Sequence, residues 1–227
     1  MKKSFIVMLL CLFNTMVFAQ NAADFNATLE AAQQGDAIAQ AQLGFMYSQG
    51  NGVRQDYALA RQWFEKAAQQ GNANAQYHLG VMYHQGSGVR QDYALAVQWY
   101  EKAAQQGDAM AQARLGVMYD QGNGVRQDDA LAVQWYERAA QQGNANAQVN
   151  LGLLYTQGNG VRQDYALAAQ WYEKAAQQGD AMAQYNLGLM YDQGYGVRQN
   201  TAQAKAYLGR ACDGGLQEGC DYYRELN

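Results

Sequence analysis

The sequence predicts an all-α protein, a right-handed α-solenoid superhelix of stacked helix-turn-helix repeats. The first observation is a segment of about 36 residues that recurs five times, because a period of this length is typical of a solenoid. The second is the absence of proline from all 227 residues, which suits a chain made largely of helices. The third is that each copy contains two helical stretches bounded by turn residues, and no pattern that indicates a strand.

The first 19 residues have the features of a secretory signal peptide. Two lysines precede an apolar run, and we expect cleavage after Ala19. The run is about 14 residues long, shorter than the roughly 20 residues that span a bilayer. Cys11 suggests a lipoprotein as the alternative, although Leu10 stands where lipoprotein signals have a small residue. We expect export through a cleavable signal peptide to the periplasm, with secretion or surface association left open, and no membrane span.

The rest of the chain divides into five repeats and two shorter ends. In the first repeat Asp36 suits the N-cap of one helix, Gly50 its C-terminus, and Asp56 the N-cap of a second helix that we expect to end at Gly71. The expected segments are an N-terminal capping helix at 20–35, repeats at 36–71, 72–107, 108–143, 144–179 and 180–215, and a C-terminal capping helix at 216–227.

Comparison of the five copies separates each first helix into two faces. At 100° per residue, constant positions such as Leu43, Gly44 and Tyr47 cover one half of the helical wheel, and we expect this half to pack. The changing positions occupy the other half, which we expect to be open; in the first repeat they are 38, 41, 42, 45 and 48. In the second helices, the stripe around Trp63 and Phe64 is interpreted as core and not as a cofactor site.

The constant residues carry a family resemblance. The motif Leu-Gly-x-Met-Tyr-x-x-Gly-x-Gly-Val at 43–53, followed by Ala-x-x-Trp-Phe-x-Lys-Ala-Ala at 60–68, is similar to the Sel-1-like repeat of the tetratricopeptide-repeat superfamily. The resemblance extends from Asp36 to Gly215. It implies a TPR-like stack whose first helices line a concave groove, in an exported bacterial protein that acts as an adaptor in envelope processes or host contact.

Two cysteines follow the predicted signal peptide, Cys212 and Cys220. In an oxidising compartment we expect them to form a disulfide bond. A redox or metal role is less favoured, because catalytic dithiols usually lie two residues apart and no second Cys or His pair accompanies these. The pair also resembles the helix-to-helix staple of the cysteine-rich members of the family.

The sequence gives little support to catalysis. His78 and His84 lie about 240° apart on one helix, which does not suit a shared metal ion, and they are interpreted as polar residues on a solvated face. Ser48 and Ser87 belong to neither a Ser-x-x-Lys nor a Gly-x-Ser-x-Gly motif. The Gly-x-Gly turns follow no strand and precede no Lys-Ser or Lys-Thr, so they are not phosphate loops. We therefore expect no enzyme activity, no metal and no cofactor.

Charge argues against two classes of partner. Loss of the two signal-peptide lysines takes the net charge from −4 to about −6, and no basic cluster is present, so neither nucleic acid nor an anionic membrane is expected. One arginine recurs in each interhelical loop, giving the row Arg54, Arg90, Arg126, Arg162 and Arg198. The favoured interpretation is that each pairs with nearby carboxylates or carbonyls and holds the loop; the alternative is a row that binds anions. Asp129, where three other repeats have Tyr, has no explanation in the sequence.

The changing half of the first helices is the expected binding site for a protein or peptide, because it combines apolar, aromatic and polar side chains. The alternative is sequence drift on an exposed face. The candidate residues are Phe45, Tyr77, His78, Val81, His84, Met110, Arg114, Val117, Asn150, Leu153, Tyr185, Asn186 and Leu189.

The resemblance supplies three functional hypotheses. The first is an exported, non-catalytic interaction scaffold. The second is an immunity or inhibitor protein that neutralises a toxin in the periplasm. The third, by analogy with the cysteine-rich members, is a β-lactam-binding or β-lactamase-like protein, for which the chain lacks the serine-lysine pair or zinc ligands that the reaction needs.

Overall fold

The computed structural model describes residues 24–226, so the predicted signal peptide and residues 20–23 lie outside the described part. The described residues contain twelve helices and no strand, which confirms the all-α solenoid class. They form two compact units, one ending at Gln106 and the other beginning at Gly107. Within each unit, every helix packs against the helix before it and the helix after it in the chain.

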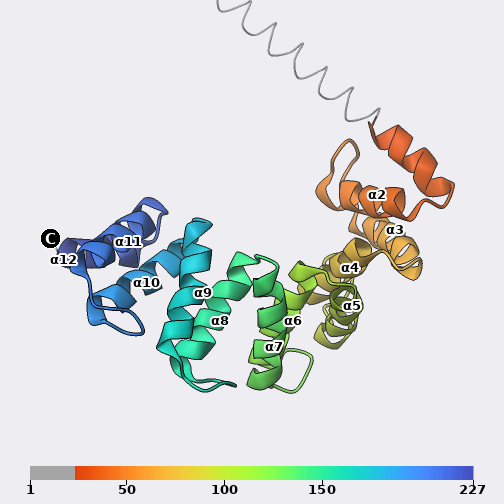
Figure 1. Cartoon of the computed structure of the whole chain (residues 1–227). Helices are drawn as coiled ribbons and strands as arrows, with labels where there is room; N and C mark the ends of the chain where they lie inside the picture. The colour runs from red at the N-terminus through yellow and green to blue at the C-terminus, as the bar shows by residue number, and fades with distance from the viewer. Residues whose placement is uncertain (1–23, 227) are drawn as a thin grey trace, which may run out of the picture. The chain divides into compact units, whose positions relative to one another are not determined.

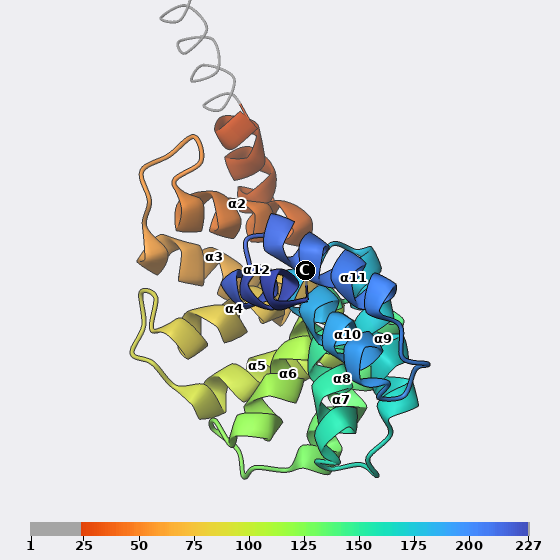
Figure 2. The ribbon, with the colours of Figure 1, turned by 90° about the vertical axis from the view of Figure 1, so that its left-hand side faces the viewer.

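Each repeat contributes two helices of thirteen residues, which lie side by side and are joined by a loop (Figures 1 and 2). The first helices are α2 (Ala37–Gln49), α4 (Ala73–Gln85), α6 (Ala109–Gln121), α8 (Ala145–Gln157) and α10 (Ala181–Gln193). The second helices are α3 (Tyr57–Gln69), α5 (Tyr93–Gln105), α7 (Asp129–Gln141), α9 (Tyr165–Gln177) and α11 (Thr201–Asp213). A helix at 24–33 precedes them and α12 (Gln217–Glu225) follows.

The helix ends follow the local chemistry of the repeat. The Asp36 carboxylate accepts a hydrogen bond from the Ala39 N–H at 2.8 Å, and Asp56 caps α3 in the same way. Gly50 ends α2 in the left-handed conformation with φ of 75°, which favours glycine. The prediction that α3 ends at Gly71 is wrong by two residues. The helix stops at Gln69, and Gly71 takes φ of 87° in the turn that follows.

The buried clusters of the core join the second helix of one repeat to the first helix of the next, as α3 to α4 and α7 to α8. In the first unit Leu79 and Phe64 are fully buried, and in the second Leu151 and Tyr136 are. Within each of the first four repeats, the constant glycine of the first helix faces a large aromatic ring of the second helix: a Cβ atom on Gly80 would lie 2.5 Å from the ring of Tyr100. In the fifth repeat Gly188 faces Leu208 instead. The constant half of the first helices is therefore the packed half.

The C-terminal end is closed by a disulfide bond between Cys212 and Cys220, as predicted, with the two Cα atoms 4.4 Å apart. The bond joins the end of α11 to the start of α12. The Tyr222 hydroxyl donates a hydrogen bond of 2.8 Å to Asp192 of α10. This hydrogen bond, and then burial, raise the pKa of Tyr222. No helix in residues 24–226 combines the length and the apolar character that a membrane crossing requires.

Candidate partner-binding site

The changing positions of the first helices, here called the groove positions, differ in exposure. Each groove position is named by its number in the first repeat, so that the 38-type position comprises residue 38 and its equivalents in the other four repeats. This position is exposed in all five repeats, and Ile38 is 65% exposed. The 42-type and 45-type positions are exposed or half-buried. Ala41 and Ser48, predicted to be open, are buried, and the 41-type and 48-type positions of the other repeats are half-buried. The open face is thus narrower than the sequence predicted, because its two edges meet the neighbouring helices.

Exposed apolar side chains gather at the groove positions. Eight large hydrophobic side chains are exposed among the described residues, and five of them are groove residues: Ile38, Phe45, Met110, Leu153 and Met182. Burying such side chains in the core would stabilise a fold by about 1.5 to 3 kcal/mol each, so their recurrence on one face of the first helices is informative.

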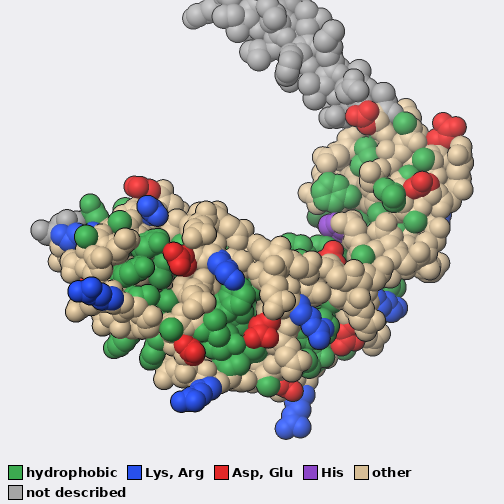
Figure 3. Space-filling model, in the orientation of Figure 1, with side chains coloured by type: hydrophobic (Ala, Val, Ile, Leu, Met, Phe, Trp, Pro, Cys, Tyr) green, Lys and Arg blue, Asp and Glu red, His purple; other side chains and the backbone are tan. Residues whose placement is uncertain are grey.

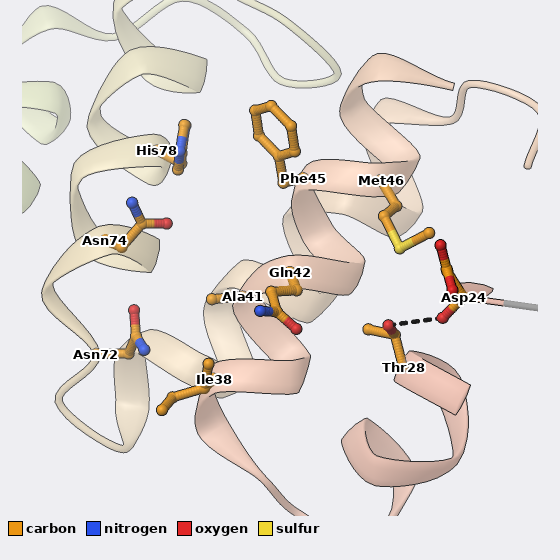
Figure 4. Close-up of a pocket in the computed structure, with 10 residues that line it drawn as sticks. All are labelled: Asp24, Thr28, Ile38, Ala41, Gln42, Phe45, Met46, Asn72, Asn74 and His78. Carbon is orange, nitrogen blue, oxygen red and sulfur yellow. Dashed lines mark hydrogen bonds between the residues drawn. The ribbon is translucent and has the colours of Figure 1, made fainter. Parts of the chain in front are cut away.

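A pocket of about 560 Å³ opens on this face in the first unit. Ile38, Gln42 and Phe45 of α2 form one wall, and Asn74 and His78 of α4 form the opposite wall (Figure 4). Its remaining lining residues are Asp24, Thr28, Ala41, Met46 and Asn72. The Thr28 hydroxyl donates to the Asp24 carbonyl at 2.8 Å, which orders the edge that the N-terminal helix contributes.

His78 belongs to an aromatic cluster beside this pocket. Its ring stacks on Phe64 with centroids 5.0 Å apart, and the ring of Phe45 lies 5.7 Å away. The interpretation of His78 as a solvated polar residue is therefore wrong, since it is half-buried between aromatic rings. His84 is also half-buried and contacts the Tyr93 ring at 5.3 Å.

A second pocket, of about 260 Å³, opens at the same groove positions of the second unit. Met110, Ala113, Arg114 and Val117 of α6 face Asn146 and Asn150 of α8, and Asn144 completes the lining. The two pockets are thus lined by equivalent positions. In both units one repeat contributes its 38-, 41-, 42- and 45-type residues, and the next repeat contributes its 36-, 38- and 42-type residues. Asn144 contributes an amide nitrogen 3.4 Å from the Met110 sulfur.

The structure brings together only part of the predicted set. Phe45 and His78 line the first pocket, and Met110, Arg114, Val117 and Asn150 line the second. The predicted residues that line neither are Tyr77, Val81, His84, Leu153, Tyr185, Asn186 and Leu189. The Tyr77 ring, for example, packs against Tyr100 with centroids 5.9 Å apart. Sequence reasoning missed Asn72 and Asn144 as pocket residues, because both are also helix caps.

The loop arginines do not hold their loops. Arg54, Arg90, Arg126, Arg162 and Arg198 are exposed, and none makes a hydrogen bond or ion pair within residues 24–226, so the favoured interpretation is wrong. The next residue holds the loop instead. Gln91 donates to the His84 carbonyl at 2.8 Å and to the Tyr93 hydroxyl at 3.0 Å. On the face in Figure 3, Lys and Arg side chains lie singly and form no basic patch.

Comparison with known proteins identifies the repeat. The Sel1 repeat family model matches residues 37–72, 73–108, 109–144, 145–180 and 181–216. None of the curated proteins is similar enough to match this chain.

Solved structures show the same repeat. A protective antigen of uropathogenic Escherichia coli strains, which has an SLR fold, is 42% identical with a TM-score of 0.86; the match covers 89% of this chain and 43% of the antigen, less than half of that protein. A Sel1 repeat protein from Oxalobacter formigenes is 33% identical with a TM-score of 0.79, over 89% of this chain and 86% of the other. An immunity protein from Pseudomonas aeruginosa is 24% identical with a TM-score of 0.56, over 85% and 73%, and shares the fold. The chain therefore belongs to the Sel1 repeat family.

Proposed function

We propose that this protein is an exported, non-catalytic scaffold that binds a protein or peptide partner along the groove positions of its first helices. One observation carries the proposal: an apolar-edged pocket opens at the same groove positions in each of the two units. Pockets that combine apolar walls with a few polar groups are typical of recognition sites, and the constant residues of the same helices are occupied in the core.

Two further observations support export. The Cys212–Cys220 disulfide suits an oxidising compartment. The relative from uropathogenic Escherichia coli, 42% identical, is described as a protective antigen, which agrees with a protein that leaves the cytoplasm. We expect the protein isolated from the periplasmic fraction to begin at Gln20, as read by N-terminal sequencing. A chain that keeps its first 19 residues in that fraction would contradict the cleavage site.

Partner binding is tested by affinity capture from a periplasmic extract with the mature protein, followed by mass spectrometry and titration of the purified partner. The groove variant carries Phe45→Ala and Leu153→Ala. The control variant carries Tyr195→Ala and Tyr223→Ala, two exposed large side chains outside the groove positions. We expect the groove variant to bind at least tenfold more weakly, since one buried aromatic anchor contributes on the order of 2 kcal/mol, and the control to bind normally. Equal weakening in both variants would place the interface elsewhere.

The same capture experiment tests the inhibitor hypothesis, because recovery of a toxin enzyme that loses activity in the complex would define the scaffold as an immunity protein. The likeness to the Pseudomonas immunity protein, at 24% identity, supports the fold alone. For the β-lactam hypothesis we expect no nitrocefin hydrolysis by the purified protein above the rate of a buffer control. Turnover that survives further purification would overturn the proposal of a non-catalytic scaffold.

A further inference from the structure

Arg114 sets the second pocket apart from the first. The equivalent positions of the other repeats hold neutral amides or histidine: Gln42, His78, Asn150 and Asn186. Arg114 is exposed, lines the pocket, and makes no hydrogen bond or ion pair with any residue in the described part of the chain. A guanidinium carries five N–H donors and no acceptor. An unpaired arginine in a concave site therefore presents a strong preference for an anionic acceptor.

The other polar groups of the pocket add donors on the opposite wall. Asn146 and Asn150 lie one helical turn apart on α8, and neither side chain makes a hydrogen bond within residues 24–226. The Asn144 carbonyl oxygen is occupied, because it accepts from the Ala147 N–H at 2.9 Å, while its amide nitrogen has only the Met110 sulfur as a contact. No acidic side chain lines the pocket.

Apolar surface lies directly beside these donors. Met110 is 46% exposed, and Val117 is half-buried on the same helix face. A ligand that satisfied Arg114 could therefore also cover an apolar wall. An extended peptide does both, because neighbouring residues supply a carboxylate, an apolar side chain, and main-chain groups that amide side chains can hydrogen-bond.

We propose that the pocket lined by Met110, Arg114 and Asn150 binds an acidic side chain within an extended segment of the partner, next to an apolar residue that contacts Met110 and Val117. This inference rests on the proposed function, and it names the chemistry that one of the two pockets recognises. The pocket of the first unit does not share this preference, because Gln42 replaces the arginine and Asp24 lines its wall. The two pockets therefore differ in the residue they select.

The first experiment selects ligands from a bead library of N-acetylated hexapeptides attached through their C-termini, which carry no terminal charge. We expect the mature protein to retain peptides enriched in Asp or Glu beside an apolar residue. We expect the Arg114→Gln variant, which carries the residue of the first repeat, to lose the acidic enrichment. The control is Arg162→Gln, which removes the same charge from an exposed loop of the same unit and should leave the enrichment intact.

The second experiment titrates a selected soluble peptide, amidated at its C-terminus, by fluorescence anisotropy. Replacing its acidic residue by the matching amide should weaken binding at least about tenfold, and Arg114→Gln should weaken the acidic peptide by a similar factor. The two changes together should cost little more than either alone, because both remove the same interaction.

Each contrary outcome has a separate meaning. Retention of no peptide by the mature protein would contradict the proposed function as well as this inference. Retained peptides without acidic preference would overturn only the inference, as would an acidic preference that survives in Arg114→Gln. A parallel library with free C-terminal carboxylates tests whether the bound acidic group is the end of a chain. If peptides were retained only from that library, the assignment of the acidic group to a side chain would be overturned.

Discussion

At the scale of single residues, the constant glycine of each first helix sets how closely the two helices of a repeat approach. The position is helical and buried, so its glycine is not required by backbone conformation. The glycine is required because the second helix leaves no room for a side chain. A Cβ atom on Gly116 would lie 2.5 Å from the ring of Tyr136, a distance that real Cβ contacts do not reach. The large fully buried ring occupies the volume that the glycine leaves.

Gly116→Ala is therefore expected to destabilise the fold by about 1 to 2 kcal/mol, since overpacking outweighs the better helix propensity of alanine. Gly209 provides the matched control, because a Cβ atom there would lie 3.5 Å from the Tyr223 ring, an ordinary contact. Gly209→Ala should be neutral or stabilise by up to about 1 kcal/mol. Urea unfolding of both variants measures the difference, and equal effects would show that the ring moves aside without cost.

Asp129 acquires an explanation in the structure. In the three repeats that have Tyr at this position, the loop glutamine donates to the tyrosine hydroxyl. In this repeat Gln127 donates to the Asp129 carboxylate at 3.1 Å instead. The substitution keeps the hydrogen bond but adds a charge near Asp120. Burial, and then the charge of Asp129, raise the pKa of Asp120. The folded state therefore holds the Asp120 carboxylate in an unfavourable environment at neutral pH.

The raised pKa gives a prediction with a defined sign. Stability linked to protonation of Asp120 is fully present below its unfolded value near 3.8 and is lost as the pH rises through the higher folded value. Asp120→Asn should raise the melting temperature at pH 7 and match the wild type at about pH 3. Because the carboxylate is partly exposed and screened, the gain should stay below about 1 kcal/mol. Glu30→Gln, at an exposed site, is the control, and a pH-independent gain at Asp120 would refute the linkage.

At the scale of elements, a buried glutamine in each first helix joins successive helices. Gln148 of α8 donates to the carbonyl of Ala140 at 3.1 Å, and its own carbonyl accepts from Gln178, which follows α9, at 2.8 Å. The same pair of bonds recurs at Gln40 and Gln76. Each glutamine thus adds a side-chain hydrogen bond to a carbonyl near the end of the preceding helix, which also accepts a backbone N–H, and it binds the glutamine that follows the second helix of its own repeat.

Gln148→Leu is expected to lower the free energy of unfolding by about 1 to 3 kcal/mol, because it removes two hydrogen bonds at a buried site, the one to the Ala140 carbonyl and the one from Gln178. Gln170 of α9 is exposed and makes no hydrogen bond within the described residues, so Gln170→Leu is the control. Chemical denaturation followed by circular dichroism compares the two. A loss of the same size at Gln170 would mean that the side-chain network contributes nothing beyond helix propensity.

The elements also show what the sequence could and could not predict. Helix caps and the packed half depend on residues repeated in five copies, so Asp36 and Leu43 were assigned correctly. The edges of the groove were assigned incorrectly, because the burial of Ala41 depends on how neighbouring helices meet. The environment of His78 was also missed, because the rings that surround it, Phe45 and Phe64, lie on two other helices, α2 and α3. The sequence predicted that each loop arginine pairs with a nearby carboxylate. Those carboxylates, such as Asp56 and Asp92, instead accept hydrogen bonds from the N–H groups at the start of a helix.

At the scale of the whole molecule, the contacts link helices that are adjacent or nearly adjacent in the chain. In a stack of this kind, stability is approximately the sum of the repeats and the interfaces between neighbours. An end must then be closed by something other than another repeat. At the C-terminus that element is α12, which has only nine residues and no side-chain N-cap, so it would be marginal as an isolated helix.

The disulfide bond holds this weak closing helix to its support. Gly219 of α12 is buried against Ala211, where an added Cβ atom would lie 2.8 Å from the alanine methyl group, so the two helices meet closely. Closing a loop with a sequence separation of 8 stabilises by roughly 2 to 3 kcal/mol on the chain-entropy estimate. The double variant Cys212→Ser and Cys220→Ser removes this constraint while keeping side chains of similar size.

We expect the double variant to fold with its C-terminal end loosened. Amide hydrogen exchange should accelerate in α12 and in the last turn of α11, because these residues lose the constraint directly. Exchange in α2 to α4 should stay unchanged, since nearest-neighbour stabilisation does not carry the loss that far. Reduction of the wild-type protein should reproduce the pattern. Uniform acceleration in every helix would instead show that the described repeats unfold as one cooperative body, with the closing helix setting the stability of the whole stack.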